Sequence, residues 1–412
     1  MDKTDRDRIG RAGGARAGLV VFLVCVFSLN QFAISIFLPA MPAMAKALGA
    51  GGASAKATLT VYLFVYAIAA LIHGPLSDRY GRRPVLLVGL GLYTLASFAC
   101  ALAPGIEVLL AARVFQAIGA AAGVVVTRAI ARDTMDGPEL VRTNAYLSTG
   151  QGVAPGLAPL LGGLLAGWGD WTWTFHVTGL IGLALLAAAS RGPAESNRQR
   201  IARIGVAELA AGYASVLRNR AFLGAVGAAG LSTGPWYGYF AASPDLLIDR
   251  MGVSPAAYGL HILIGVVVFM VAGMACARLA GRYRETSVLG LGMAASFAGV
   301  AALAALAAGG GLSLTTISLA LYVYAAGQGF VFPITATAAV RPFPTRAGTA
   351  ASAYLFLFMT MAALGSIAPA LIHADLLVGL PAAMAIMIVL SASCLIGVYL
   401  PAVRAAASAP PA

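Results

Sequence analysis

The segment best suited to a switchable ion pair follows the second long apolar run of the chain. Its sequence, Gly74-Pro75-Leu76-Ser77-Asp78-Arg79-Tyr80-Gly81-Arg82-Arg83, places one acid and three arginines between two apolar stretches. A carboxylate and an arginine form a charge-assisted pair that can be made and broken, and glycines let two helix ends approach closely. The segment therefore predicts a conformational latch formed by Gly74, Asp78, Arg79, Gly81, Arg82 and Arg83. The alternative is a basic turn that only fixes topology, which would need no acid within it.

A second charged residue, Arg113, lies inside an apolar run. Burying a guanidinium in a bilayer is costly, so an intramembrane arginine is a candidate functional group. Gln116, Gly119 and Gly123 follow it at intervals of about one helical turn and make one face polar or small. This pattern predicts an intramembrane charge site at Arg113 and Gln116. The alternative is that Arg113 reaches the near membrane interface, with Glu107 as a loose partner.

Prolines and glycines alternate in the next apolar run. Pro155 and Pro159 are four residues apart, and Gly162 and Gly163 follow. Proline removes a backbone donor and bends a helix, whereas small residues let a neighbouring helix pack closely. These four residues predict a hinge in a protein whose parts move against each other. An ordinary kinked helix is the alternative.

Several kinds of chemistry are not supported by the sequence. The four cysteines are far apart, without a C-x-x-C pair or a histidine at metal-ligand spacing, so we expect no disulfide framework, metal site or other cofactor. There is no G-x-x-x-x-G-K-S/T loop, which disfavours an ATP-driven pump. No nucleophile lies near a base in an enzyme-like pattern, so we expect no enzymatic activity. An ion gradient or the substrate's own gradient remains as the energy source.

The elements that position these residues are long apolar segments. Sixty per cent of the 412 residues are hydrophobic and 10% are charged, whereas soluble domains have about 25% charged residues. A membrane span needs about 20 apolar residues. The sequence predicts an all-α integral membrane protein with twelve spans at residues 18–38, 55–74, 85–103, 108–129, 143–167, 173–189, 222–242, 257–276, 287–308, 314–336, 349–372 and 377–400.

Basic residues are distributed unequally between the two sides of the predicted bundle. Of the 27 Lys and Arg residues, 23 fall on the side of the Asp78 loop, and the other side has only Lys46, Lys56 and Arg250. Basic loops stay in the cytoplasm. This asymmetry predicts that both termini are cytoplasmic, and it explains the net charge of +12 without a nucleic-acid partner.

These motifs together resemble the major facilitator superfamily. Its signatures G-x-L-x-D-R-x-G-R-R, R-x-x-Q-x-x-G and a Pro/Gly-rich antiporter motif stand here in order. The ending Phe37-Leu38-Pro39-Ala40 of the first span, the segment Arg128-Ala129-Ile130-Ala131-Arg132-Asp133 and the segment 347–353 extend the resemblance to the Bcr/CflA drug-resistance branch of drug/proton antiporters. The resemblance implies two six-helix bundles around a midplane cavity that opens alternately to either side. We place these bundles at residues 1–190 and 221–412, with a cytoplasmic linker at 191–220.

One departure from that branch concerns proton coupling. Members usually carry an acid three positions before the Leu-Pro of span one, where this chain has Ser35, and none of its fifteen acids falls near a bilayer midplane. Arg113 without an acidic neighbour favours an anionic substrate over a lipophilic cation. His261 and Asp245 are the remaining candidates for proton coupling, and His261 is equally compatible with hydrogen-bonded packing.

Polar and aromatic residues in the predicted spans are candidates for lining the cavity, because such side chains can stack on and hydrogen-bond to organic molecules. With Arg113, they are Asn30, Gln31, Tyr62, Tyr66, Gln151, Trp236, Tyr237, Tyr239, Tyr258, His261, Gln328 and Tyr354. Each is also compatible with core packing or an interfacial anchor.

The sequence thus predicts a proton-coupled exporter of a small organic molecule in the bacterial inner membrane. A dedicated exporter of a metabolite such as a siderophore is the main hypothesis, because the acid of span one is missing. Multidrug or phenicol-type efflux is the alternative, and a transport-inactive membrane sensor is a third hypothesis of another class. The expected partners are the substrate, the lipid bilayer and protons, and the resemblance implies a monomer.

Overall fold

Helices are the only regular secondary structure in the part of the chain that the structure describes. The computed structural model describes residues 3–192, 194–197, 205–343, 346–373 and 375–403. Within these ranges, twelve α-helices have 19 residues or more. Each of them coincides with one of the apolar segments that the sequence predicts.

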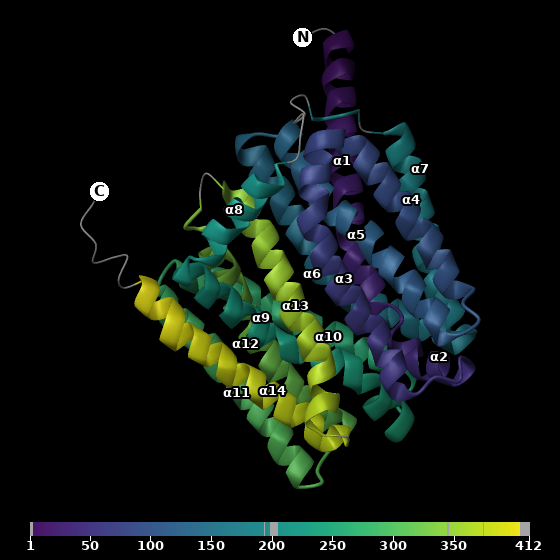
Figure 1. Cartoon of the computed structure of the whole chain (residues 1–412), viewed down its shortest axis with the longest axis vertical. Coiled ribbons are helices and arrows are strands. Elements are labelled where there is room, and N and C mark those ends of the chain that lie inside the picture. Colours follow the sequence, from purple (N-terminus) through teal and green to yellow (C-terminus); the bar gives the residue numbers. More distant parts are fainter. Residues whose placement is uncertain (1–2, 193, 198–204, 344–345, 374, 404–412) are drawn as a thin grey trace.

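The first six long helices form one side of the molecule (Figure 1). They and the short elements between them are α1 (Lys3–Ser35), η1 (Leu38–Ala40), α2 (Met41–Ala47), α3 (Gly52–Tyr80), α4 (Arg82–Ala101), α5 (Ile106–Thr134), α6 (Gly137–Trp168) and α7 (Thr172–Arg191). We call this set the N-terminal half.

The remaining long helices form the other side (Figure 1). They are α9 (Arg220–Ser243) with its π-helical continuation η2 (Pro244–Arg250), α10 (Pro255–Ala280), α11 (Glu285–Ala308), α12 (Leu314–Val340), α13 (Ala347–Ile372) and α14 (Leu376–Cys394) with η4 (Leu395–Tyr399). We call this set the C-terminal half. A further helix, α8 (Val206–Leu217), lies in the segment predicted as a linker, and the sequence analysis did not anticipate it.

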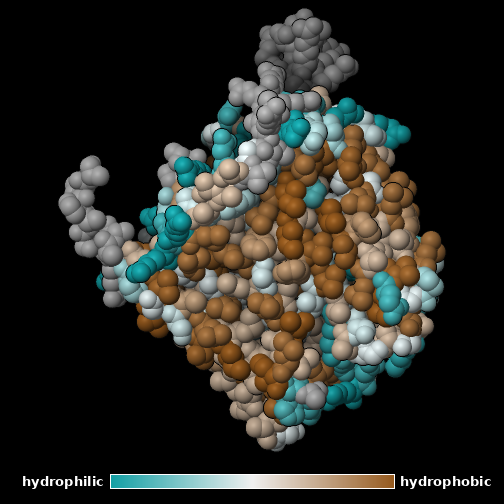
Figure 2. All heavy atoms as spheres, in the orientation of Figure 1, coloured by the Kyte–Doolittle hydropathy of each residue, from teal (hydrophilic) through white to brown (hydrophobic). Residues whose placement is uncertain are grey.

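In the described part of the chain, ten helices are long and apolar enough to cross a membrane. Helices α6 and α9 are long but are not among the ten, because they are rich in glycine and polar residues. An apolar band covers most of the face shown in Figure 2, with hydrophilic residues above and below it. This is the surface expected of a protein that exchanges contacts with lipid.

Side-chain caps fix several helix starts. The Asn219 side chain accepts a hydrogen bond from the backbone N–H of Phe222 at the start of α9, and Asp375 accepts one from the N–H of Leu377 at the start of α14. Such caps satisfy donors that have no partner within the helix. The helix starts are therefore determined by local sequence.

Glycines set the distance between paired helices. A Cβ atom on Gly119 of α5 would lie 2.6 Å from the carbonyl oxygen of Gly89 in α4, and one on Gly327 of α12 would lie 2.5 Å from the carbonyl oxygen of Gly292 in α11. No side chain fits at these distances, so the backbones of α4 and α5, and of α11 and α12, touch directly.

Candidate functional site

The predicted latch is an ion-pair network at one end of the N-terminal half, which we call the latch end. Arg82 Nη1 lies 2.5 Å from Asp78 Oδ1, and Arg82 Nε lies 2.9 Å from Asp133 Oδ2 at the end of α5. Arg82 Nη1 also donates to Ser77 Oγ at 2.7 Å. Arg82 is buried, so these charge-assisted bonds are only weakly screened by solvent. The network joins the end of α3 to the ends of α4 and α5.

The segment after α7 also binds the latch. The Glu195 carboxylate accepts hydrogen bonds from the backbone N–H groups of Arg82 at 2.8 Å and Arg83 at 3.2 Å. The Asn197 side chain donates to the carbonyl oxygen of Asp78 at 2.9 Å. A carboxylate at a helix start is favourable because it satisfies free N–H groups and complements the helix dipole. Sequence reasoning identified neither contact.

The other predicted latch residues have different environments. Gly81 has a φ of 104°, which explains why glycine occupies the turn between α3 and α4. Arg83 donates to the carbonyl oxygen of Ser190 at 2.7 Å, whereas the exposed Arg79 lies over the ring of Tyr80. Gly74 lies on α3 beside Val125, where an added Cβ would have ordinary van der Waals contact. The structure thus brings Asp78, Arg82 and the turn glycine together, but not Arg79.

Arg113 is fully buried, with no exposed surface. Its guanidinium donates to Gln116 Oε1 at 2.6 Å and to the carbonyl oxygen of Ala33 at 3.1 Å, and Gln116 donates to Ser97 Oγ at 2.8 Å. The charge also lies 4.2 Å from the ring centroid of Tyr62, a cation–π distance. These partners all belong to the N-terminal half, and Arg113 Nη2 has no hydrogen-bond partner.

The predicted hinge residues lie where α6 meets other elements. A Cβ on Gly162 would collide with the carbonyl oxygen of Ile36 in the N-terminal half, and one on Gly163 would collide with the carbonyl oxygen of Pro255 in the C-terminal half. Helix α6 continues through Pro155 and Pro159. The two glycines therefore allow one helix to contact both halves closely.

Besides Arg113, five of the predicted lining residues lie in the N-terminal half. Asn30 accepts a hydrogen bond from the Tyr62 hydroxyl at 3.0 Å and donates to Gln31 at 3.4 Å. Tyr66 stacks on Tyr62 with ring centroids 6.5 Å apart, and its buried hydroxyl has no hydrogen-bond partner. Gln151 is half-buried on α6. The structure brings the first four of these side chains together.

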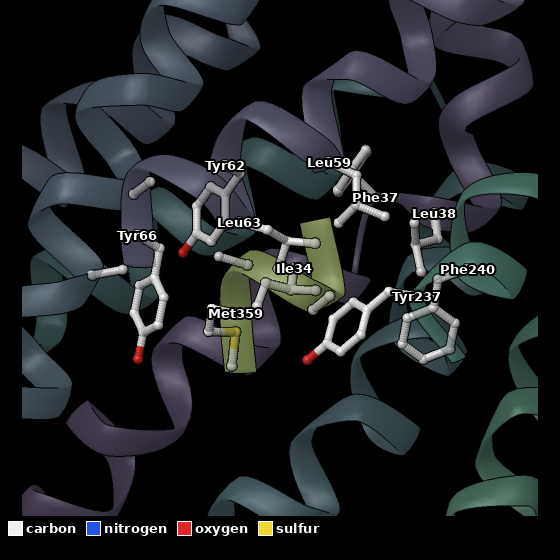
Figure 3. Packing of buried hydrophobic residues seen from close by; sticks show 14 of the residues in the cluster. Ile34, Phe37, Leu38, Leu59, Tyr62, Leu63, Tyr66, Tyr237, Phe240 and Met359 are labelled. Atoms are coloured by element: carbon white, nitrogen blue, oxygen red, sulfur yellow. The ribbon is translucent and has the colours of Figure 1, made fainter. Parts of the chain in front are cut away.

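The predicted lining residues of the C-terminal half form separate groups. Trp236 stacks on Tyr324, with ring centroids 6.2 Å apart, whereas Tyr237 packs among the apolar residues between the two halves (Figure 3). Gln328 donates to Ser296 Oγ at 3.0 Å. Tyr354 stacks on Phe358 of the same helix, and the Tyr354 hydroxyl has no hydrogen-bond partner.

His261 is the centre of a polar cluster within the C-terminal half. Its Nε2 lies 2.6 Å from the Tyr239 hydroxyl, and its Nδ1 lies 2.8 Å from Ser318 Oγ and 3.2 Å from the Tyr322 hydroxyl. The neighbouring Tyr258 hydroxyl pairs with Ser243 instead. Both ring nitrogens of this histidine are thus hydrogen-bonded, and the cluster contains no charged side chain.

Asp245 has a different environment, at the end of the bundle opposite the latch. Its Oδ2 lies 2.6 Å from Nζ of Lys56, so the pair joins η2 of the C-terminal half to α3 of the N-terminal half. Lys46 and Asp249 form a second, more exposed pair across the halves at 3.4 Å. Both pairs leave the two halves free to separate if the charges are neutralised or solvated.

Two further residues bear on the site. Ser35, at the position of the missing acid, is fully buried, and its hydroxyl donates to the carbonyl oxygen of Gln31 at 2.8 Å.

Arg128 lies within α5, but the sequence analysis counted it among the loop charges. Its exposed side chain lies 4.8 Å from the ring centroid of Phe27. Arg128 already falls within the predicted fourth span, 108–129, so its position there could have identified it as a second intramembrane arginine.

Known proteins similar to this chain are transporters. The Major Facilitator Superfamily model matches residues 23–366. The uncharacterized MFS-type transporter YdgK of Bacillus subtilis (strain 168) is 33% identical over 299 residues, which cover 71% of this chain and 74% of that protein. A chloramphenicol resistance protein of Pseudomonas aeruginosa is 34% identical over 289 residues, which cover 70% of this chain and 68% of that protein.

A solved structure gives the same fold. A bacterial homolog of the human lysosomal transporter Spinster, in an inward-facing and unoccupied conformation, has a TM-score of 0.71 and 15% sequence identity. The alignment covers 97% of this chain and 99% of that chain. At this identity, the similarity establishes the architecture and carries no information on substrate.

Proposed function

The chain belongs to the Major Facilitator Superfamily, and from that premise we propose that it exports small organic molecules as a drug-efflux transporter. The similarity to a chloramphenicol resistance protein supports this alternative of the sequence analysis. A siderophore as the dedicated substrate has no such support, so drug efflux becomes the leading hypothesis. A bacterial inner membrane is the matching location, because YdgK and the chloramphenicol resistance protein come from bacteria.

One observation carries the proposal: the two halves are joined by breakable contacts at the end opposite the latch. These contacts are the Lys56–Asp245 ion pair and a hydrogen bond of 2.7 Å between Thr60 Oγ1 and Ser366 Oγ. Helices α6 and α10 add direct backbone packing there, since a Cβ on Gly259 would lie 2.5 Å from the carbonyl oxygen of Pro159. Contacts of this kind suit alternating access, in which one end closes while the other opens.

The same contacts define the state of the transporter in this proposal. With the latch on the cytoplasmic side, as the distribution of basic residues favours, the end opposite the latch faces outwards and is closed. Arg128, in the half of α5 nearer the latch, has an exposed side chain. In this proposal the conformation is one that is closed to the outside.

Topology follows from the same reasoning. We count α6 and α9 as spans although they are less apolar than the other ten, because α9 is buried along almost its whole length and α6 packs on α1 and α10. Polar residues that face protein are tolerated in a membrane helix. This gives twelve spans, two bundles at 1–190 and 221–412, a linker at 191–220 and cytoplasmic termini.

Proton coupling through Asp245 agrees better with the geometry than coupling through His261. Asp245 lies in an ion pair that crosses the halves, so its protonation would remove a bond that closes the outer end. His261 bonds only within the C-terminal half. A proton that enters from outside would therefore weaken the outer closure and favour release of the drug.

Accumulation of radiolabelled chloramphenicol in cells that lack their own efflux pumps tests the function. Cells with the wild-type protein should accumulate less drug than cells with Asp78→Asn, and a protonophore should abolish the difference. Glu139→Gln is a matched control, because this acid pairs with Arg16 at the same end in an exposed contact of 3.3 Å outside the latch. Equal accumulation in wild-type, Asp78→Asn and empty-vector cells would reject efflux of this drug and favour the membrane-sensor hypothesis.

A further inference from the structure

A pocket of about 430 Å³ lies in the C-terminal half, where α9 and α11 begin and where α12 and η4 end. Each of these elements contributes to its lining, with residues such as Ala221, Thr286, Ala338 and Tyr399. The pocket is at the same end of the molecule as the latch. The start of α13 follows α12 there, and a Cβ on Gly348 would lie 3.8 Å from Nη1 of Arg132 on α5. The volume falls within the range of about 300–1,000 Å³ that is typical of small-molecule sites.

Two arginines give the pocket a positive lining. Arg284 directly precedes α11 and Arg341 directly follows α12, and both residues are exposed. Glu285 is the acid of the described lining, and its carboxylate lies 3.6 Å from Nη1 of Arg341, whose side chain is 75% exposed. An ion pair with this distance and exposure is weak. Since two helices begin and two end at the pocket, their dipoles oppose one another, and the arginines supply the net positive charge.

The inner wall of the pocket is apolar. Leu289 of α11 and Ala338 of α12 are buried there, and Val403 continues the apolar lining beyond η4. Helices α11 and α14 pack on each other, and Figure 1 shows α14 at the edge of the C-terminal half away from the N-terminal half. Leu291 of α11 and Ile396 of η4, close in sequence to lining residues, are exposed. The pocket therefore combines a charged opening with an apolar outer surface.

The pocket is also at the depth expected for lipid headgroups. Three segments that are long and apolar enough to cross a membrane begin or end at it, namely Glu285–Ala308, Leu314–Val340 and Leu376–Val403. Headgroups lie where membrane spans end. With the latch on the cytoplasmic side, this end faces the inner leaflet, whose anionic lipids attract basic residues close to the membrane.

We propose that this pocket binds the headgroup of an anionic phospholipid. Arg284 and Arg341 bind the phosphate, since the guanidinium fork matches phosphate oxygens in a bidentate arrangement. The acyl chains lie against the exposed apolar residues of α11, α14 and η4. A free phosphate ion has the charge but no part that would pack on the apolar wall, so the structure favours a lipid. The inference goes beyond the proposed export function and does not depend on it.

The site belongs to one half of the protein. The elements that line it, α9, α11, α12 and η4, are all in the C-terminal half. In alternating access the two halves move against each other, so a ligand held within one half binds both conformations equally. Asp78→Asn, which alters the latch, should therefore leave lipid binding unchanged, and a failure of the export proposal would not affect the lipid site.

Native mass spectrometry of the purified full-length protein in detergent tests the site. The probes are phosphatidylglycerol, which is anionic, and phosphatidylethanolamine, which is zwitterionic, with identical acyl chains. A basic residue close to an anionic lipid contributes about fivefold in affinity. With two arginines and one acid in the lining, the wild type should bind phosphatidylglycerol about fivefold or more tightly than phosphatidylethanolamine.

Substitutions locate the preference. Arg284→Gln and Arg341→Gln should each weaken phosphatidylglycerol binding about fivefold, and Arg341→Lys should keep part of the affinity because it keeps the charge. Glu285→Gln should strengthen binding, because it removes the acid that competes for Arg341. A gain in affinity cannot come from misfolding. Arg282→Gln is the matched control, since this exposed arginine is in the same loop between α10 and α11 but does not line the pocket.

Three results would overturn the proposal. The first is equal binding of the two lipids by the wild type, and the second is a loss of affinity in Arg282→Gln as large as in Arg341→Gln. The third concerns the source of the phosphate. If inorganic phosphate stabilises the wild type against heat as strongly as phosphatidylglycerol at the same concentration, the pocket is a site for free anions and not for a lipid.

Discussion

The two halves contain the same helix pair built with different chemistry. In the N-terminal half, Gln116 of α5 donates to Ser97 of α4, and in the C-terminal half Gln328 of α12 donates to Ser296 of α11. The difference lies at the amide oxygen of each glutamine, which accepts a hydrogen bond from a different kind of donor. Gln116 accepts a hydrogen bond of 2.6 Å from Arg113, whereas Gln328 accepts a weak one of 3.5 Å from the Thr233 hydroxyl.

This comparison teaches that the packing of the pair does not require charge. Both pairs have backbones in direct contact at glycines, but among the described residues only the N-terminal half adds a buried arginine and an ion-pair network at its end. A buried charge lowers stability unless it is well satisfied. The charges are therefore better explained by a role in conformational change or substrate handling, and the C-terminal half serves as an internal neutral reference.

The largest effect on transport should come from a substitution in the latch. Asp78→Asn removes a charge-assisted bond of 2.5 Å to a buried arginine, and such bonds contribute about 1.5–3 kcal/mol. Initial rates of drug efflux should fall by about tenfold or more, since each 1.4 kcal/mol changes an equilibrium about tenfold. The matched acid of the C-terminal half is Glu285, which forms an exposed pair with Arg341 at 3.6 Å. If Glu285→Gln reduces the rate as much as Asp78→Asn, the two halves do not differ in this respect.

The next effect should come from the contact between the halves. Gly163→Ala places a methyl group against the backbone of α10, and overpacking of this kind costs about 1–3 kcal/mol. The outer end should open more often. An engineered Ser366→Cys, in a protein whose native cysteines are replaced, should then react faster with a membrane-impermeant maleimide. Gly167→Ala is the control, because an added Cβ there meets nothing within 4 Å. Unchanged labelling would show that α6 and α10 do not close this end.

A smaller effect should distinguish the two glutamines. Gln116→Leu removes an acceptor from a buried charge, which costs about 1.5–3 kcal/mol, whereas Gln328→Leu removes neutral hydrogen bonds worth about 0.5–1.5 kcal/mol. The melting temperature in detergent should therefore fall more for Gln116→Leu. Equal decreases would mean that Arg113 keeps enough other partners and that the two pairs are energetically alike.

The smallest effect should come from ion pairs at the outer end. Lys56→Gln breaks the pair with Asp245 across the halves and should increase opening, measured by the same maleimide assay. Arg250→Gln breaks an exposed pair with Asp375 within the C-terminal half and should leave opening unchanged.

The Arg250–Asp375 pair also predicts a dependence on pH. The Arg250 hydrogen bond and the Leu377 N–H lower the pKa of Asp375 below its ordinary value. A carboxyl group with a lowered pKa in the folded state stabilises the protein above its ordinary pKa, and the contribution is lost as the pH falls through the lowered value. Melting temperatures of the wild type and Arg250→Gln should thus converge at strongly acidic pH. A difference that persists there would show that Asp375 is not the partner responsible.

Local sequence was sufficient for much of the architecture. Each predicted apolar segment became one long helix, because a run of about 20 apolar residues in lipid can satisfy its backbone only as a helix. Helix ends were less well predicted, since polar residues extend several helices beyond the apolar run. The fourth span, for example, was predicted to end at Ala129, but α5 ends at Thr134. Arg128 lies within both the predicted span and α5, but the sequence analysis counted it among the loop charges.

The sequence by itself determined the class of the protein, its helices and the presence of a charged latch, because composition, periodicity and short motifs act within one or two helical turns. Only the tertiary structure decided what each charge faces. Asp133, 51 residues from Arg82, completes the latch, and Arg113 faces carbonyl groups and aromatic rings of its own half. Lys56 pairs with Asp245 from the other half. The direction of a helix face depends on how helices distant in sequence pack together, and no local pattern specifies that packing.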